Sequence, residues 1–396
     1  MTAIDQLPSG FIKISLSCLM LIALAAGVAA QERVSRPEAK PLPSAVEAWA
    51  NTPETFLRGL KLPVWPMPND VRIWERNGRS STRRKLISLL GELPPRPDPG
   101  KVRVTAIEDK GDYKLERFEF HNGADTIVPG LLMIPKGVKL PAPTIIALHH
   151  YGSSKDDVLI NPLHSRPSVN DHIGTLLVKR GFVVAAIDSY FHGERVGSGP
   201  AGKTANAAQQ ELDLFKLNLW LGRNLWGMMI RDQQCLLDYL ATRSEIDPSR
   251  IGVTGMSMGC ALAHWVAALD DRVRVVAGVA CFTRYRELLA YAGVKEHSIY
   301  YYVPGILKHF DAEALHALIA PRPHLELTGD RDNKAPLAGV QVLEKKLGQF
   351  YRLYGKEQDF RSIVYQNTGH EYLPEMKTEV ADWFEKHLSP AQASKR

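Results

Sequence analysis

Cysteine is scarce in this sequence, and neither sign of charge dominates. Only four cysteines occur among 396 residues, and none has the C-x-x-C spacing of a common metal site. A disulfide-scaffold protein is therefore excluded. The 49 Lys and Arg residues against 43 Asp and Glu residues leave a net charge of only +6, and there is no basic run. We therefore expect no nucleic-acid partner.

Long apolar runs are also missing beyond the N-terminus. The one marked run is Ile14–Val28, which follows Lys13 and leads to small residues suited to cleavage after Ala30. This layout is typical of a secretory signal peptide, with an uncleaved membrane anchor as the alternative. We therefore predict that residues 1–30 are a signal peptide. The mature protein is then secreted or periplasmic, without stable membrane insertion.

Cleavage would remove Cys18 and leave Cys235, Cys260 and Cys281. Free cysteines are among the most buried residue types in proteins. We predict three buried thiols on core elements, with one disulfide and one free thiol as the alternative.

The rest of the chain divides by composition into two parts. Residues 31–45 are rich in proline and charge and indicate a linker, while Val71–Leu90 predicts a helix. Residues 31–100 are therefore expected to form an N-terminal linker and helical extension. Residues 101–390 alternate short apolar runs with helical segments and are expected to form one α/β domain.

Strands are predicted in two groups within this domain. The first group alternates apolar and polar residues, as an antiparallel sheet edge does, and comprises Val102–Glu108, Tyr113–His121 and Thr126–Pro135. The second group is continuously apolar, as buried parallel strands are, and comprises Thr144–His149, Phe182–Asp188, Ile251–Gly255, Val273–Cys281, His324–Thr328 and Ser362–Gln366. Helices are predicted between these runs at Asp171–Arg180, Trp226–Thr242, Ala261–Leu269, Leu337–Tyr351 and Glu375–Leu388. The fold class is thus α/β, with a mostly parallel central sheet, an antiparallel N-terminal edge and helices on both faces.

The sharpest local feature is Gly255-Met256-Ser257-Met258-Gly259. This G-x-S-x-G pattern lies between a strand-like run and a helical one, which is the setting of a nucleophile elbow. The tight turn exposes the Ser257 hydroxyl at a helix N-terminus, where the Met258 N–H can stabilise an oxyanion.

A serine hydroxyl needs a base, and the base needs an acid to orient it. His370 follows the last predicted strand, at the sheet end where catalytic groups gather in α/β proteins. Asp330 and Asp332 follow the preceding strand, and we favour Asp332 because it lies deeper in the loop. Asp330 is the alternative, or a loop-capping residue paired with Arg331.

The loop after the strand at Thr144–His149 is expected to supply a second oxyanion donor. The candidate is the backbone N–H of Tyr151, with Gly152 as the alternative. The pair His149-His150 has no third ligand at a helpful spacing, so no metal site is predicted. No organic cofactor is implied either.

With these motifs in place, the chain resembles the α/β-hydrolase superfamily, in particular its secreted dienelactone-hydrolase-like and acetyl-xylan-esterase-like branch. The resemblance also rests on Pro129–Pro135, His149–Gly152 and Asp188–Arg195. It implies that residues 101–390 are a hydrolase catalytic domain, with Ser257 as nucleophile, His370 as base and Asp332 as acid. The sequence departs from the branch at His150 and Cys260, where glycine is usual. Dienelactone hydrolases commonly use a cysteine nucleophile, which disfavours that specific reaction.

Two excursions flank the expected pocket and hold the candidate substrate contacts. Glu194 and Arg195 form an ion pair that holds the loop, or contact an anionic substrate. Trp226 and Tyr301 stack on a sugar, or pack a cap against the sheet.

Together these features predict an exported serine carboxylic-ester hydrolase that forms an acyl-enzyme. By resemblance, its substrate is an acylated carbohydrate or a small ester. The alternatives are a prolyl-oligopeptidase-like peptidase and a non-catalytic binding module on a hydrolase scaffold. The sequence defines no oligomeric state.

Overall fold

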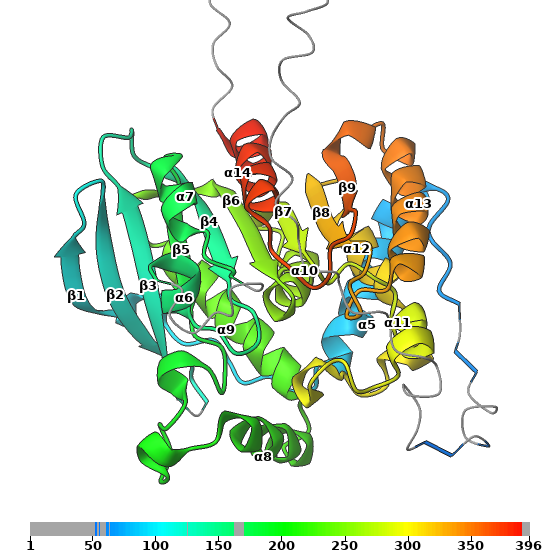
Figure 1. The fold of residues 1–396 in the computed structure, drawn as a ribbon, viewed down its shortest axis with the longest axis horizontal. Coiled ribbons are helices and arrows are strands. Elements are labelled where there is room, and N and C mark those ends of the chain that lie inside the picture. The colour runs from blue at the N-terminus through cyan, green and yellow to red at the C-terminus, as the bar shows by residue number, and fades with distance from the viewer. Residues whose placement is uncertain are drawn as a thin grey trace, which may run out of the picture. The chain divides into compact units, whose positions relative to one another are not determined.

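A central sheet organises the chain in the computed structural model (Figure 1). The structure describes residues 64–124, 126–161 and 170–389, together with residues 52, 53, 55, 61 and 62. The predicted signal peptide and the predicted linker at residues 31–45 lie outside the described residues. The described part of the chain belongs to a single compact unit.

The strands and helices follow the order expected from the sequence. The strands are β1 Arg103–Asp109, β2 Tyr113–His121, β3 Ile127–Pro135, β4 Ala142–Leu148, β5 Val183–Ile187, β6 Ile246–Met256, β7 Val273–Val279, β8 His324–Gly329 and β9 Phe360–Tyr365. The helices are α4 Val71–Ile73, α5 Arg79–Leu89, α6 Lys155–Leu159, α7 Gly174–Lys179, α8 Ala207–Trp220, α9 Leu225–Leu240, α10 Met258–Leu269, α11 Tyr285–Ala292, α12 Ala312–Ile319, α13 Leu337–Leu353 and α14 Pro374–Leu388. A π-helical turn, Trp74–Gly78, joins α4 to α5.

The sheet has the mixed topology predicted from the strand patterns. Its order is β1-β2-β3-β5-β4-β6-β7-β8-β9. The pairs β1–β2, β2–β3 and β3–β5 are antiparallel, whereas every pair from β5 to β9 is parallel. The carboxyl ends of β4, β6, β8 and β9 therefore meet at one edge, and the loops that leave this edge carry the predicted triad and oxyanion residues.

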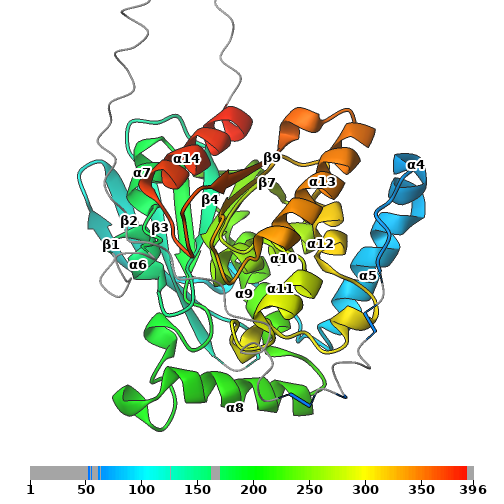
Figure 2. The same ribbon diagram turned by 45° about the vertical axis from the view of Figure 1, so that its right-hand side comes forward.

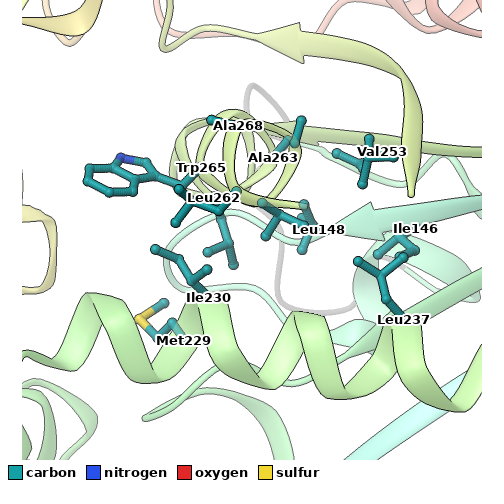
Figure 3. Packing of buried hydrophobic residues seen from close by; sticks show 14 of the residues in the cluster. Ile146, Leu148, Met229, Ile230, Leu237, Val253, Leu262, Ala263, Trp265 and Ala268 are labelled. Carbon is teal, nitrogen blue, oxygen red and sulfur yellow. The ribbon is translucent and has the colours of Figure 1, made fainter. Parts of the chain in front are cut away.

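Alternate residues of the parallel strands bury opposite faces of the sheet. Ile146 and Leu148 of β4 belong to one buried cluster, which also takes in side chains of α9 and α10 (Figure 3). Ile145 and Ala147 belong to the other, together with side chains of α6, α7 and α14. This two-residue period, with helices on both faces, explains why the strands read as continuous apolar runs. Figure 2 shows α14 and α7 apart from α10 and α5.

Several boundaries differ from the predictions for local reasons. Helix α7 starts at Gly174, not Asp171, because the Asp171 carboxylate accepts the His150 N–H at 2.9 Å. Helix α10 starts at Met258, three residues before the predicted start, since the turn at Ser257 leads directly into it. Helices α6, α8, α11 and α12 were not predicted. In α8, the large apolar residues Leu217, Leu219 and Trp220 are exposed, so the helix shows no clear apolar face.

The three described cysteines, Cys235, Cys260 and Cys281, are free and buried, as predicted. Among the described helices, none combines the length and the apolar character needed to cross a bilayer.

Candidate active site

Ser257 occupies a strained turn between β6 and α10. Its backbone φ is 55° and its ψ is −115°, a region that residues with a Cβ rarely adopt. A Cβ on Gly259 would lie 2.1 Å from the Leu148 carbonyl oxygen, and one on Gly255 would lie 2.5 Å from the backbone of Gly259. Both glycines are therefore required by close backbone approach. The turn presents the Ser257 hydroxyl at the N-terminus of α10.

His370 and Asp332 continue from this hydroxyl as one hydrogen-bonded chain. His370 Nε2 lies 2.8 Å from Ser257 Oγ, and His370 Nδ1 lies 2.9 Å from both carboxylate oxygens of Asp332. Asp332 is buried and also accepts the Lys334 N–H at 2.8 Å. The structure thus brings together three residues that are 38 to 113 positions apart in the sequence.

Asp330 has a different environment. Its carboxylate accepts the Thr368 N–H at 3.0 Å, and its own N–H donates to the Tyr365 carbonyl at 3.0 Å. These bonds tie the loop before His370 to the end of β8. Arg331 bonds to Asn367, not to Asp330. Of the two aspartates that the sequence left open, Asp332 is the one hydrogen-bonded to His370.

Two buried imidazoles hold the loop after β4. The Ser189 N–H donates to His149 Nε2 at 3.0 Å, and the Gly152 N–H donates to His192 Nε2 at 2.9 Å. Each Nε2 is an acceptor, so each proton resides on Nδ1, which donates to a nearby backbone carbonyl. Burial lowers the pKa of His149, and it lowers the pKa of His192 well below the ordinary value. Both rings are therefore neutral, and each joins two backbone segments through its two ring nitrogens.

A cavity of about 630 Å³ opens in front of Ser257. Its lining residues come from the loop after β4, the elbow, the segment before Tyr300, and the loops of Asp332 and His370: His150, Tyr151, Gly152, Ser257, Lys295, Glu296, His297, Ser298, Tyr300, Lys334 and His370. Lys334 binds the backbone carbonyl of Glu296 at 2.7 Å and its carboxylate at 3.2 Å, which ties one wall to the loop of Asp332. Burial lowers the pKa of His297 to about 4, so this wall carries a neutral imidazole near pH 7.

The four predicted substrate contacts lie outside this lining. Glu194 pairs with Lys155, and Arg195 is buried against Asp232 at 2.7 Å, so the two do not pair with each other as predicted. Trp226 is buried in the core, and Tyr301 stacks on His297 with ring centroids 4.3 Å apart. These aromatic rings support the cavity wall from behind.

Sequence reasoning missed Glu211, a buried residue of α8. Its carboxylate accepts the hydroxyls of Tyr151 and Ser298, each at 2.9 Å, and the Tyr300 N–H at 3.0 Å. One carboxylate thus joins both walls of the cavity. The helix itself gave no periodic signal, so a functional role for Glu211 could not be read from the sequence.

Comparisons with known proteins agree with this architecture. The sequence profile of the Abhydrolase family matches residues 67–343. A Bacillus subtilis (strain 168) protein named as a hydrolase, YtaP, is 34% identical over 315 residues, which cover 78% of this chain and 100% of that protein.

Solved structures share the fold at lower identity. A Bacteroides fragilis NCTC 9343 protein named as an acetyl xylan esterase superposes with a TM-score of 0.63 at 20% identity, over 78% of this chain and 80% of that one. A glucuronoyl esterase from Solibacter usitatus gives 0.58 at 15% identity, over 83% of this chain and 99% of that one. The chain belongs to the Abhydrolase family and has the α/β-hydrolase fold.

Proposed function

We propose that this protein is a serine carboxylic-ester hydrolase that works through an acyl-enzyme. The observation that carries the proposal is the hydrogen-bonded chain from Ser257 through His370 to Asp332, which opens onto the cavity of about 630 Å³. This is the geometry that a base-activated serine nucleophile needs.

In the proposed reaction, Ser257 Oγ attacks the ester carbonyl while His370 Nε2 takes its proton. Asp332 holds the proton on Nδ1 and balances the charge of the imidazolium. The tetrahedral intermediate then collapses, His370 returns the proton to the leaving alcohol, and the acyl group stays on Ser257. Water, deprotonated by His370, attacks the acyl-enzyme and releases the acid and the free serine.

Two backbone N–H groups are proposed to stabilise the oxyanion. Met258 is the first residue of α10, and its N–H has no carbonyl acceptor within the helix. In the loop after β4, the N–H groups of His150 and Gly152 already donate to Asp171 and His192. Because these two N–H groups already have acceptors, the N–H of Tyr151, which lies between them in the sequence, is favoured over that of Gly152 as the oxyanion donor.

An acylated carbohydrate or a small polar ester is the proposed substrate. The cavity walls carry ionic and polar side chains, including Lys295, Glu296, Ser298 and Lys334. Such a lining suits a hydroxyl-rich alcohol better than a lipid chain. The names of the two solved structures, acetyl xylan esterase and glucuronoyl esterase, support the same class.

The test compares wild type with Ser257→Ala on p-nitrophenyl acetate, acetylated xylo-oligosaccharides and peptide p-nitroanilides. We expect ester turnover by wild type, none by the variant, and covalent labelling of Ser257 by a fluorophosphonate. Peptide cleavage without ester turnover would replace the proposal with a peptidase. Absence of both labelling and turnover in folded protein would replace it with a binding module.

Export is part of the proposal and rests on residues 1–30. N-terminal sequencing of protein recovered from the periplasm or medium should give a chain that begins at Gln31. Recovery of uncleaved chain from the cytoplasm alone would contradict export but would leave the esterase proposal intact.

A further inference from the structure

Three imidazoles and one carboxylate converge behind the elbow, away from the cavity of Ser257. One nitrogen each of His264, His316 and His324 and one oxygen of Glu326 all lie within 4.8 Å of one another. It is the one such group found among the described residues. All four side chains are buried, and Glu326 and His324 are fully so.

The topology explains why these residues meet. His324 and Glu326 are two apart on β8, so they point to the same face of the sheet. His264 lies on α10 and His316 on α12, the helices that pack together on this face. Gly278 on β7 leaves room for the carboxylate, because a Cβ there would lie 2.5 Å from Glu326 Oε2.

The Glu326 carboxylate contacts two imidazoles and the thiol of Cys260. Its Oε1 lies 2.6 Å from His264 Nε2 and 2.5 Å from His324 Nε2. Among the described residues, its ion-pair distances are to these two rings and to no Lys or Arg. A buried carboxylate without a permanent cation is costly, so a cation bound at this place would be stabilising.

Imidazole nitrogens and a carboxylate oxygen are common ligands of divalent metal ions, so an ion bound among these side chains would supply a positive charge next to the carboxylate. His316 Nδ1 is buried and has no hydrogen-bond partner among the described residues, so it is available to bind an ion.

We propose that His264, His316, His324 and Glu326 form a structural site for one divalent transition-metal ion, with zinc as the best-suited ion. Three imidazoles and a carboxylate are typical zinc donors, and four protein ligands close a tetrahedral site. Bond lengths of about 2.0–2.2 Å place tetrahedral donors roughly 3.4 Å apart. On binding, the widest donor pair, at up to 4.8 Å, would contract by up to about 1.4 Å. The two Glu326–imidazole pairs, now at 2.6 and 2.5 Å, would lengthen by about 0.8–0.9 Å.

The ion would connect the elements that carry the proposed reaction. Helix α10 begins next to Ser257, and β8 leads into the loop of Asp332. His264 lies seven residues beyond Ser257, which is about 10 Å along the helix axis. Because protein ligands take all four positions and none of these residues lines the Ser257 cavity, the ion acts on stability and on the placement of α10 against β8.

The first experiment measures zinc uptake by the full chain after treatment with a chelator, in competition with a chromophoric chelator. We expect wild type to bind one zinc ion, and cobalt in its place to give the visible bands of a tetrahedral site. His316→Phe is the main variant, because the ring packs beside Phe282 and a phenyl ring fills similar volume. It should bind zinc at least about 100-fold more weakly.

The matched control is His309→Phe, which changes an exposed histidine just before α12. It should bind zinc as wild type does. Zinc should also raise the melting temperature of wild type and of this control, but not that of His316→Phe. Glu326→Gln, checked for folding by circular dichroism, should lose the cobalt bands.

Two results would overturn the proposal. One is folded wild type that takes up neither zinc nor cobalt. The other is equal uptake by wild type and His316→Phe, because the ion would then lie elsewhere. Neither readout uses ester turnover, so the metal-site proposal and the proposed function can fail independently of each other.

Discussion

Replacing Asp332 by asparagine tests the arrangement around His370 most directly. In the structure, both carboxylate oxygens lie 2.9 Å from His370 Nδ1, and Oδ1 also accepts the Lys334 N–H at 2.8 Å. An asparagine side chain would keep its oxygen at the Oδ1 position to satisfy Lys334. Its NH₂ group would then face His370 Nδ1 and oppose a proton there.

The favoured tautomer of His370 would then carry its proton on Nε2, which could no longer accept the proton of Ser257. We expect kcat/KM for p-nitrophenyl acetate to fall about 10³–10⁴-fold, or about 4–5.5 kcal/mol in transition-state free energy. Because asparagine is isosteric with aspartate, the fold should be retained.

Asp330→Asn is the matched control. The Asp330 carboxylate accepts the Thr368 N–H, and an amide oxygen can accept the same bond. We expect less than about a tenfold loss of kcat/KM and a stability cost of about 1 kcal/mol. Equal losses in the two variants, or a loss below tenfold in Asp332→Asn, would refute the assigned role of Asp332.

Three further predictions concern the framework of the site. Gly259→Ala should lower the free energy of unfolding, measured by urea denaturation, by about 3 kcal/mol, because the new Cβ would lie 2.1 Å from the Leu148 carbonyl oxygen. A variant as stable as wild type would contradict this close approach. Glu211→Gln should lower the free energy of unfolding by about 2 kcal/mol and raise KM more than it lowers kcat, since the amide cannot accept every hydrogen bond of the carboxylate. An unchanged KM would count against the role of Glu211 in joining the cavity walls. The pKa of His297 is about 4, against an ordinary 6.5, so the unfolded chain binds more protons between these values. Its contribution to stability is complete above pH 6.5 and should decline as the pH falls toward 4, by up to about 1.4 kcal/mol per pH unit, and His297→Gln should remove that decline.

Much of the fold could be predicted because local pattern and tertiary role agree. Continuous apolar runs predicted the parallel strands, because a strand buried on both faces is apolar throughout. Alternating apolar and polar residues predicted the antiparallel edge, because only one face of those strands is buried. The elements that were missed break this agreement. Helix α8 exposes Leu217 and Trp220, so neither its existence nor the buried Glu211 followed from periodicity.

The candidate substrate contacts show a second limit of prediction from the sequence. Trp226 and Tyr301 have the right chemistry for stacking on a sugar, and only their packing behind the wall excludes them from the cavity lining. Lys295 and Lys334 line the cavity instead, although nothing in their local sequence marks them out.

Sequence patterns were enough to locate the turn at Ser257, because close backbone contacts require glycine two positions before and two positions after the serine, which leaves a recognisable pentapeptide. They were also enough to predict the class of fold and the position of His370 after the last strand. Only the packed structure shows which of Asp330 and Asp332 contacts the His370 imidazole, since both follow β8 within three residues. It alone also gathered His264, His316, His324 and Glu326 into one buried cluster, because contacts between β8, α10 and α12 depend on how helices pack on a sheet and leave no spacing to read.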